Sequence, residues 1–409
     1  MSGREIAELV QKALTRLGEL SYSSGTIELY RKNHFKKIIR YFQSNGQDYF
    51  DENLIMRYIA EVNVQQQSKT LSAHYCNDLR RAAYLLIDHN TSDCPAWRVH
   101  GSNRKYVPSA SYTHVIHKIL DSTDLKEGFK YKINYVLRKF CCYLEEKNIS
   151  SFSSITIEHV IAFLKAVQES NRGSMDYILY SLRLLLRYLK EQNVREISVD
   201  LSIFKPVKRG QKILPSFSKE ELRLILGHID KSTAIGKRDY AILLLAATTG
   251  MRGGDIINLK LSDIDWRKYE LSFTQGKTNC RVTLPVGGAA GNAVAEYILH
   301  GRPQTDSSYV FIKTHAPYTK IKGTSTLDTV LKKHCIRAGF EGKEYKGFHG
   351  IRRSIGTWMV TSGVSCQTVS QVLGHKKLDS SKRYISADES FARCSLSFIG
   401  IPVKSEVYR

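Results

Sequence analysis

Apolar residues in the first two hundred positions recur at the spacing of helix faces. Between positions 35 and 42 they fall three and four apart, the polar break Ser44-Asn45-Gly46 follows, and further helices are predicted over 51–62 and 71–87. A helix ends where Gly and small polar residues interrupt its periodic pattern. The pattern therefore predicts a helical module at the start of the chain.

A second set of helical segments follows at 135–144, 155–167 and 182–189. It echoes the first set with an offset of roughly 103 residues, which is too long for a solenoid repeat and suits two copies of a small helical domain. Two unrelated helical bundles share much of the same pattern, so duplication and chance likeness both stay open. Under either interpretation, the first 200 residues are predicted to be helical.

The pattern changes in the second half of the chain. Residues 218–221 have the Ser-x-x-Glu spacing of a capping box, and 239–248 is apolar nearly all round, which predicts a central helix. Segments 270–274 and 281–285 alternate as strands around a hairpin tip, and a short strand is predicted at 309–312. This region is therefore predicted to be mixed, with more helix than strand.

Two stretches with Pro, Gly and Ser, at 93–112 and 201–215, are predicted to be linkers. The length of the chain also favours two to three domains over a single core. The predicted fold class is mainly α, multi-domain, with a small antiparallel sheet in the last domain. The predicted domains are a helical N-terminal module (1–100), a second helical domain (110–200), a basic linker (201–215) and a mixed α+β domain (216–409).

Composition narrows the class of protein. No apolar run approaches the roughly 18 residues that a membrane span needs, and the N-terminus lacks the apolar core of a signal peptide. We therefore expect a protein without membrane spans that is made and kept in the cytoplasm. The eight cysteines include no C-x-x-C pair, which indicates reduced thiols and neither a disulfide framework nor a zinc site.

The charge balance points to a polyanionic partner. Lysine and arginine number 61 against 39 acidic residues, giving a formal net charge of +22 spread along the chain. Nucleic acid is the simplest such partner, although a basic protein with no such partner has the same balance. Part of the excess lies in the second linker, whose cations are expected either against DNA phosphates or in a solvated loop. They are Lys205, Lys208, Arg209 and Lys212.

The segment that begins at His349 holds most of the candidate chemistry. His349 and Arg352 are three positions apart, so on a helix they point the same way. Gly374 provides a break that lets His375 face back, and Tyr384 follows nine positions after His375. Taken singly, each of these residues is more often structural, but their order and spacing together favour a functional site.

These residue types suit the cleavage of a DNA phosphodiester. The reaction needs a nucleophile, stabilisation of the charge that develops on the phosphate oxygens, and a proton for the departing sugar oxygen. Tyr384 supplies the nucleophile once positive charge helps its hydroxyl, with an ordinary pKa of about 10, to lose its proton. Arg252 and Arg352 offer paired donors to the non-bridging oxygens. Lys277, at the hairpin tip, is suited to protonate the leaving 5′ oxygen.

Three more residues complete this hypothesis. His375 is expected to hydrogen-bond a phosphate oxygen, and His349 to accept the tyrosine proton or orient the hydroxyl. Asp255, three residues after Arg252, is expected to hold a neighbouring side chain in place without touching DNA. No cofactor is expected, because guanidinium groups would take the place of Mg²⁺. The sequence also has no metal-ligand spacing and no G-x-x-x-x-G-K-[ST] loop for ATP.

The sequence resembles the catalytic region of the tyrosine recombinases, also called phage-type integrases. Thr-Gly-Met-Arg with an acid three residues later resembles the family's first arginine motif. Gly-Lys in a hairpin resembles its lysine turn, and Leu-Gly-His with a tyrosine nine residues later resembles its most recognisable motif. The resemblance runs from Ser218 to the C-terminus, and 112–200 resembles the family's core-binding domain. Arg353 departs from the pattern, since the family more often has histidine there. The matching residues are Arg252, Lys277, His349, Arg352, His375 and Tyr384.

The resemblance implies a site-specific recombinase that cuts and rejoins double-stranded DNA through a covalent 3′-phosphotyrosyl intermediate, for integration or excision of a mobile element. It also implies a homo-oligomer, expected to be a tetramer on synapsed DNA, with DNA-binding helical modules before the catalytic domain. The tail 390–409 would dock on a neighbouring protomer or on its own domain. The alternatives are DNA relaxation of the type IB topoisomerase kind and a non-catalytic DNA-binding protein on an integrase scaffold.

Overall fold

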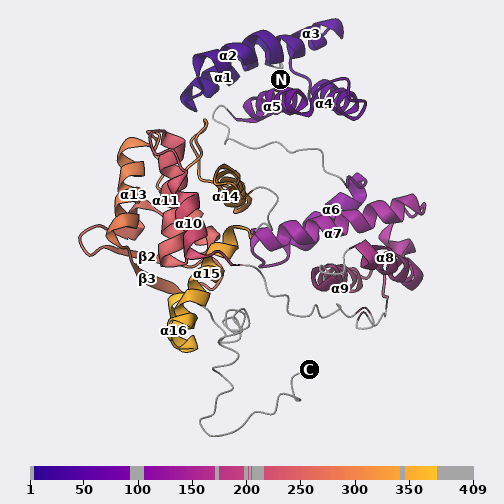
Figure 1. Ribbon diagram of the computed structural model, residues 1–409. Coiled ribbons are helices and arrows are strands. Elements are labelled where there is room, and N and C mark those ends of the chain that lie inside the picture. The colour runs from indigo at the N-terminus through magenta and orange to yellow at the C-terminus, as the bar shows by residue number, and fades with distance from the viewer. Residues whose placement is uncertain are drawn as a thin grey trace. The chain divides into compact units, whose positions relative to one another are not determined.

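The computed structural model describes residues 4–92, 106–170, 175–197, 201, 204, 216–340 and 346–374 (Figure 1). Contacts between residues divide the chain into two units, of which one comprises Met1–Glu52, Leu85–Pro95 and Ile213–Arg409 and the other Asn53–Tyr84 and Ala96–Lys212. This division differs from the domain boundaries expected from the linkers, and those domain boundaries stay a prediction. Each part is described below by itself.

The N-terminal region is helical, as predicted. The break after Ser44 and the two helices after it are confirmed, and both helices start one or two residues later than predicted and end four or five residues later. The elements are α1 (Ile6–Glu19), α2 (Ser24–Leu29), the π-helix η1 (Tyr30–Phe35), α3 (Lys36–Ser44), α4 (Glu52–Gln67) and α5 (Ala73–Thr91).

The second helical region has its own core. Its elements are α6 (Ala110–Asp121), α7 (Glu127–Glu146), the short 3₁₀ helix η2 (Phe152–Ser154), α8 (Ile157–Ser170) and α9 (Met175–Glu191). Helix α7 packs against α6, α8 and α9, and the rings of Phe140 and Phe163 meet edge to face at 4.9 Å. The described residues of this core run from Tyr112 to Phe204.

Buried positions repeat between the two helical regions. Because such positions define which helix face is packed, matching spacing is expected of a duplicated module and equally of two unrelated helical bundles. In one pair of helices, Phe35, Ile38 and Phe42 are buried at the same spacing as Leu137, Phe140 and Leu144. In another, Leu79, Ala82 and Leu86 match Leu182, Leu185 and Leu189.

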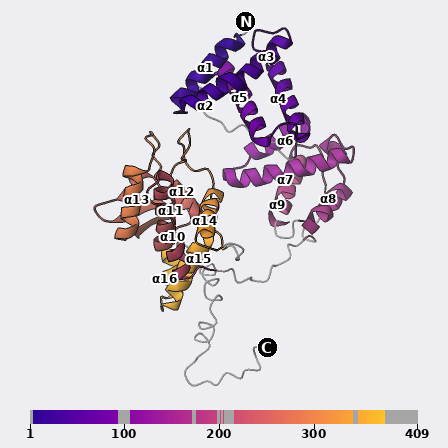
Figure 2. The same ribbon diagram turned by 45° about the horizontal axis from the view of Figure 1, so that its top comes forward.

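The C-terminal region packs helices around one central helix and a small sheet (Figures 1 and 2). Helix α11 (Ala234–Thr249) contacts α10, α12, α13 and α15, which explains why it is apolar nearly all round. The other helices are α10 (Lys219–Gly227), α12 (Gly253–Asn258), the short 3₁₀ helix η4 (Leu261–Asp263), α13 (Gly288–His300), α14 (Ser325–Arg337), α15 (Phe348–Thr361) and α16 (Cys366–Val372).

The sheet has three antiparallel strands in the order β1-β2-β3. They are β1 (Ile264–Asp265), β2 (Glu270–Thr274) and β3 (Arg281–Pro285), and the last two confirm the predicted hairpin. Leu271 pairs with Leu284 and Phe273 with Val282. The two-residue strand β1 is too short to give an alternating pattern and was not predicted.

The predicted capping box is confirmed and the predicted strand at 309–312 is wrong. The Ser218 hydroxyl accepts from the Glu221 N–H at 3.0 Å, and the Glu221 carboxylate accepts from the Ser218 N–H at 2.8 Å. Within 309–312, Tyr309 and Ile312 each make only an isolated bridge, to different segments of the chain. The apolar run there reflects burial of Val310 and Phe311 in the core, which an isolated bridge allows as well as a strand does.

A buried charge network joins α11 to α14. The Asp239 carboxylate is fully buried and accepts hydrogen bonds from Arg238, Lys333 and His334. Burial alone would raise the pKa of Asp239, but these three donors outweigh it and lower the pKa to about 2. The network fixes the end of α11 that lies far from Gly250.

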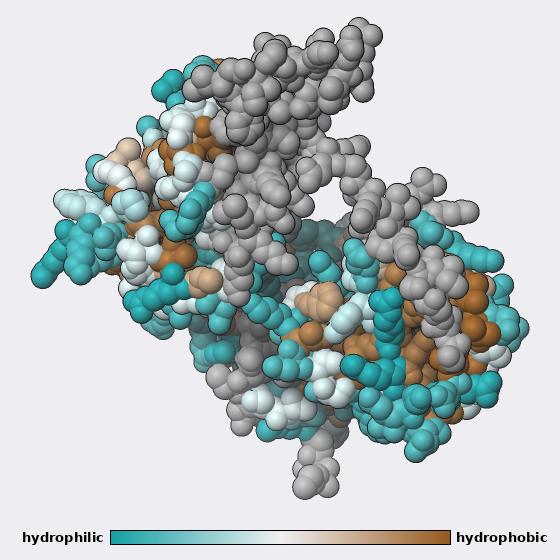
Figure 3. Space-filling view, turned by 90° about the horizontal axis from the view of Figure 1, so that it is seen from below, coloured by the Kyte–Doolittle hydropathy of each residue, from teal (hydrophilic) through white to brown (hydrophobic). Residues whose placement is uncertain are grey.

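Among the described residues, no helix is long and apolar enough to cross a membrane. On the face drawn in Figure 3, hydrophilic residues are widespread and hydrophobic ones show in patches between them.

Candidate active site

The predicted site residues come from four short segments of the C-terminal region. The first segment is the turn after α11, where Gly250 caps the helix at φ 63°, a left-handed conformation that favours glycine. A Cβ at Gly250 would also lie 2.9 Å from Leu373 Cδ2, so the close approach of the α16 end requires a glycine here. This turn places Arg252 at the N-cap of α12.

Arg252 is held by two segments distant in sequence. Its Nη1 donates to Gln275 Oε1 at 2.7 Å, and its Nη2 donates to the Gly374 carbonyl at 3.0 Å. The Asp255 carboxylate lies 4.0 Å from Nη1, and the arginine side chain is only 15% exposed. A guanidinium carries five N–H donors, so this arrangement fixes its plane while leaving donors for an anion.

Arg352 lies on α15 and is 3% exposed. Its Nη1 donates to the Gly250 carbonyl at 2.7 Å and its Nη2 donates to the Leu373 carbonyl. Each arginine therefore contacts one of two consecutive carbonyls at the end of α16, those of Leu373 and Gly374. The two guanidinium groups are thus fixed against the same turn.

The β2–β3 hairpin is tied to α12 through Asp255. Its Oδ1 accepts the Gly276 N–H at 3.0 Å, and its side chain is 4% exposed. Lys277 follows at the tip of the hairpin, where it is exposed. Asp255 therefore contacts the backbone that carries Lys277 and lies beside Arg252, an arrangement that suits the supporting role expected for it.

His349 stands at the start of α15, exposed at the surface but closely surrounded by protein. Partial loss of solvent and the positive charges of Arg352, Arg353, Arg252 and Lys277 lower its pKa to about 4. The ring is therefore neutral at pH 7. The same effect indicates that these cations lie within electrostatic reach of one imidazole.

This shift gives a prediction for the free protein. An unfolded histidine has a pKa of about 6.5, so between pH 6.5 and 4 the unfolded chain binds more protons, and His349 lowers the stability of the fold as the pH falls through that range. In NMR spectra of histidine-labelled protein, the His349 ring signals should stay at the neutral position from pH 8 down to 5.5. The His349→Asn variant assigns these signals, and a midpoint above pH 6 would contradict the electrostatics described here.

The remaining predicted residues lie outside the described part of the chain. This applies to His375, to Tyr384 and to the four linker cations Lys205, Lys208, Arg209 and Lys212. Gly374, the last described residue, has φ 62°, which confirms a turn before His375. Within the described residues, no group of three or more His, Cys, Asp or Glu side chains could hold a metal ion.

One residue at the centre of this arrangement, Gln275, was missed by sequence reasoning. Gln275 is 3% exposed and receives Arg252, and its Oε1 also accepts from the Thr278 hydroxyl at 2.7 Å. Gln275 and Thr278 are both polar and lie in a predicted hairpin turn, where polar side chains are common. No signal in the sequence separates these buried residues from solvated turn residues.

The contact between Gly374 and Gln275 gives a second prediction. A Cβ at Gly374 would lie 2.4 Å from Gln275 Nε2, so Gly374→Ala must displace the glutamine and with it the Arg252 guanidinium. For the DNA cleavage expected from the sequence, we expect the rate to fall by about 10- to 100-fold, since misplacing a group that contacts the phosphate by about 1 Å costs that much. The measurement is the single-turnover rate on DNA that the wild-type protein cleaves.

Gly363→Ala is the matched control for this variant. Gly363 also has positive φ, 82°, but nothing lies within 4 Å of a Cβ there. It therefore reports the cost of backbone strain without the clash. Equal losses in the two alanine variants would show that the contact with Gln275 is not the cause.

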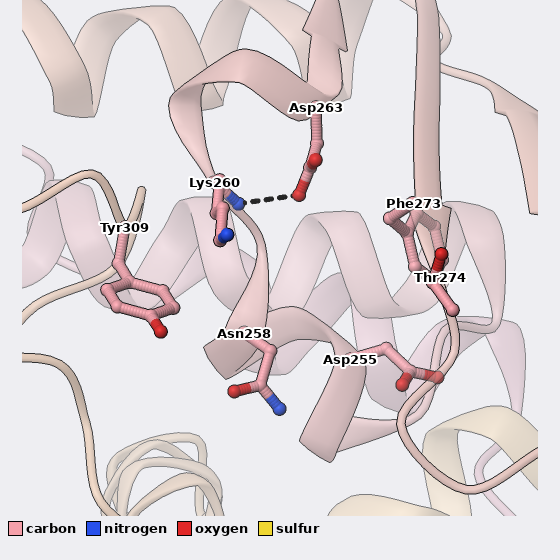
Figure 4. A pocket seen from close by; sticks show the side chains of 7 residues that line it. All are labelled: Asp255, Asn258, Lys260, Asp263, Phe273, Thr274 and Tyr309. Carbon is pink, nitrogen blue, oxygen red and sulfur yellow. Dashed lines mark hydrogen bonds between the residues drawn. The ribbon is translucent and has the colours of Figure 1, made fainter. Parts of the chain in front are cut away.

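A cavity of about 300 Å³ lies beside Asp255 (Figure 4). Among its lining residues, the Lys260 N–H donates to the Asp263 carboxylate at 2.8 Å. None of the four predicted catalytic residues that the structure describes, Arg252, Lys277, His349 and Arg352, is among its lining residues. The lining residues are Asp255, Asn258, Lys260, Asp263, Phe273, Thr274 and Tyr309.

Comparison with known sequences identifies relatives of the C-terminal region. Residues 215–390 match the model of the phage integrase family. The protein y4gC of Sinorhizobium fredii, named as an integrase/recombinase, is 32% identical over 183 residues, which are 44% of this chain and 93% of y4gC. Its relative y4rA from the same organism, named likewise, is 29% identical over 262 residues, or 63% of each chain. The chain thus spans less than two thirds of y4rA.

Solved structures show the same fold. The XerH site-specific recombinase bound to its palindromic difH substrate matches with a TM-score of 0.55 and 18% identity, over 84% of this chain and 96% of XerH. The lambda integrase tetramer bound to a Holliday junction matches with a TM-score of 0.51 and 17% identity, over 75% of this chain and 86% of the integrase. With y4gC matched over nearly its whole length, these findings agree with the resemblance in the motifs. The chain belongs to the phage integrase family, the tyrosine recombinases.

Proposed function

We propose that this protein is a site-specific DNA recombinase that cuts and rejoins DNA through a 3′-phosphotyrosyl intermediate formed on Tyr384. The observation that carries the proposal is the pair of arginines, Arg252 and Arg352, fixed against the carbonyls of Leu373 and Gly374. Tyr384 follows that turn by ten positions in the sequence.

The proposed reaction needs no atoms beyond the protein and the DNA. The Tyr384 oxygen attacks the phosphorus, and its proton passes to His349, which is neutral at pH 7 and can accept it. The bond from phosphorus to the 5′ oxygen breaks, and that oxygen takes a proton from Lys277. A 5′ hydroxyl from another strand then gives its proton to Lys277 and attacks the phosphotyrosine. Tyr384 leaves with the proton held by His349, and the diester is restored.

Charge stabilisation is assigned to the two arginines. As the tyrosine attacks, negative charge grows on the non-bridging oxygens, and guanidinium groups already fixed in place stabilise it without reorganising. The role proposed for His375 is a further hydrogen bond to one of these oxygens. Asp255 is proposed to hold Arg252 and the Gly276 backbone in place without contacting the DNA.

The proposed partners are double-stranded DNA and further copies of the chain. The net charge of +22 supports a DNA partner, and the four linker cations from Lys205 to Lys212 are proposed to contact its backbone. A tetramer on two synapsed sites is proposed because lambda integrase, of like fold, forms a tetramer on a Holliday junction. The proposed biological role of the recombination is integration or excision of a mobile element. Both helical regions, before residue 200, are proposed to bind DNA.

The experiment that tests the proposal looks for the covalent intermediate. Duplexes from the DNA flanking the gene, nicked near each candidate cut, are incubated with the protein in EDTA without nucleotide, because a short fragment that diffuses away traps the intermediate. We expect an adduct that survives SDS and disappears on protease treatment. Tight sequence-selective binding with no adduct would overturn the proposal in favour of a non-catalytic DNA-binding protein. Relaxation of plasmids of any sequence would favour a type IB topoisomerase activity.

A further inference from the structure

Gln275 stands out among the buried polar residues of the site because it contacts three separate parts of it. It follows β2 directly and its side chain is almost fully buried. Its Oε1 accepts from Arg252 Nη1 and from the Thr278 hydroxyl, each at 2.7 Å. The side chain also packs directly beneath Gly374, the residue before His375.

The backbone of Gln275 closes the hairpin that carries Lys277. Its N–H donates to the Cys280 carbonyl at 2.9 Å, and its carbonyl accepts the Asn279 N–H at 2.9 Å. Lys277 lies between these anchor points. A displacement of Gln275 therefore shifts the Arg252 contact and the hairpin backbone together.

We propose that Gln275 is a positioning residue that fixes the Arg252 guanidinium relative to the Lys277 hairpin and the Gly374 turn. This inference rests on the proposed function. A neutral amide oxygen holds Nη1 without cancelling its charge, which a carboxylate at the same place would do in part. Gln275 thus holds Arg252 without adding a second negative charge to that of Asp255, 4.0 Å from Nη1.

A purely structural role for Gln275 predicts a different result when the side chain is changed. In that case the amide would only complete the hairpin through Thr278, and its loss would lower stability without acting through Arg252. Two substitutions separate the roles. Gln275→Met keeps the length of the side chain and removes the acceptor, whereas Thr278→Val removes the other donor to the same oxygen and leaves the Arg252 contact in place.

The test measures single-turnover cleavage of a nicked duplex, DNA affinity and melting temperature for each full-length variant. We expect Gln275→Met to cleave about 10- to 100-fold more slowly than wild type, because Arg252 loses its fixed orientation. DNA affinity should change by less than about threefold. Gln275→Glu keeps an acceptor for Arg252 but sets a negative charge against it, so it should cleave faster than Gln275→Met and more slowly than wild type. Thr278→Val should cleave at close to the wild-type rate.

A double-mutant cycle shows whether the effect passes through Arg252. If it does, Arg252→Ala with Gln275→Met should be no slower than Arg252→Ala alone. Multiplied losses in the double variant, a wild-type rate for Gln275→Met, or a loss in Thr278→Val equal to that in Gln275→Met would each overturn the inference. Failure of the proposed function is distinct, because the wild-type protein itself would then form no adduct.

Discussion

Tyr384→Phe is expected to form no detectable covalent adduct with DNA, a loss of at least about 1,000-fold, because the substitution removes the oxygen proposed to attack the phosphorus. Its affinity for DNA should stay within about fivefold of wild type, since one neutral hydrogen bond contributes about 1 kcal/mol. The measurements are adduct yield on a denaturing gel and binding by gel shift, at equal protein concentration.

Tyr269→Phe is the matched control for this variant. Tyr269 is 67% exposed, in the turn between β1 and β2, so losing its hydroxyl should leave adduct formation unchanged. An undiminished adduct from Tyr384→Phe would remove Tyr384 from the proposed mechanism, whatever the other variants do.

Arg352→Lys is expected to slow strand cleavage by about 100- to 1,000-fold, the range found when a fixed donor to a developing oxyanion is removed. A lysine keeps the positive charge but presents a single nitrogen. It cannot donate in one plane to the Gly250 and Leu373 carbonyls while also meeting a phosphate oxygen. The measurement is the single-turnover cleavage rate at saturating protein.

Arg238→Lys controls for the cost of altering a buried arginine. Arg238 is 7% exposed and pairs with Asp239, and its position on α11 is about 18 Å along the helix from Gly250. This variant should lose stability and keep its cleavage rate. If Arg238→Lys slows cleavage as much as Arg352→Lys, general destabilisation and not the loss of a phosphate donor explains the effect.

Much of the fold follows from patterns of short range. The helices of the first 200 residues, the capping box at Ser218 and the hairpin of β2 and β3 depend on the spacing of neighbouring residues, which the sequence displays directly. The strand predicted at 309–312 is wrong because burial of Val310 and Phe311 in the core produces the same apolar run as a strand. Whether such a run pairs along its length depends on distant segments that a local pattern does not contain.

The residues of the candidate site also fall into those suggested by local sequence motifs and those whose contacts depend on distant segments. Arg252, Lys277, His349 and Arg352 could be selected as candidates because each lies in a short sequence motif that resembles one of the family's motifs. Gln275 was not, since its burial and its contact with Arg252 arise only when the hairpin packs against the turn at Gly374. Likewise, the low pKa of His349 depends on cations that come from separate segments of the chain.

The central claim is that Tyr384 carries the DNA, and mapping the linked peptide tests it most directly. The trapped adduct is digested with nuclease and trypsin, and the peptide that retains nucleotide is sequenced by mass spectrometry. Cleavage after Arg383 and Arg393 releases a peptide whose single tyrosine is Tyr384. The account predicts the nucleotide on that tyrosine, and a nucleotide on any other residue would contradict it.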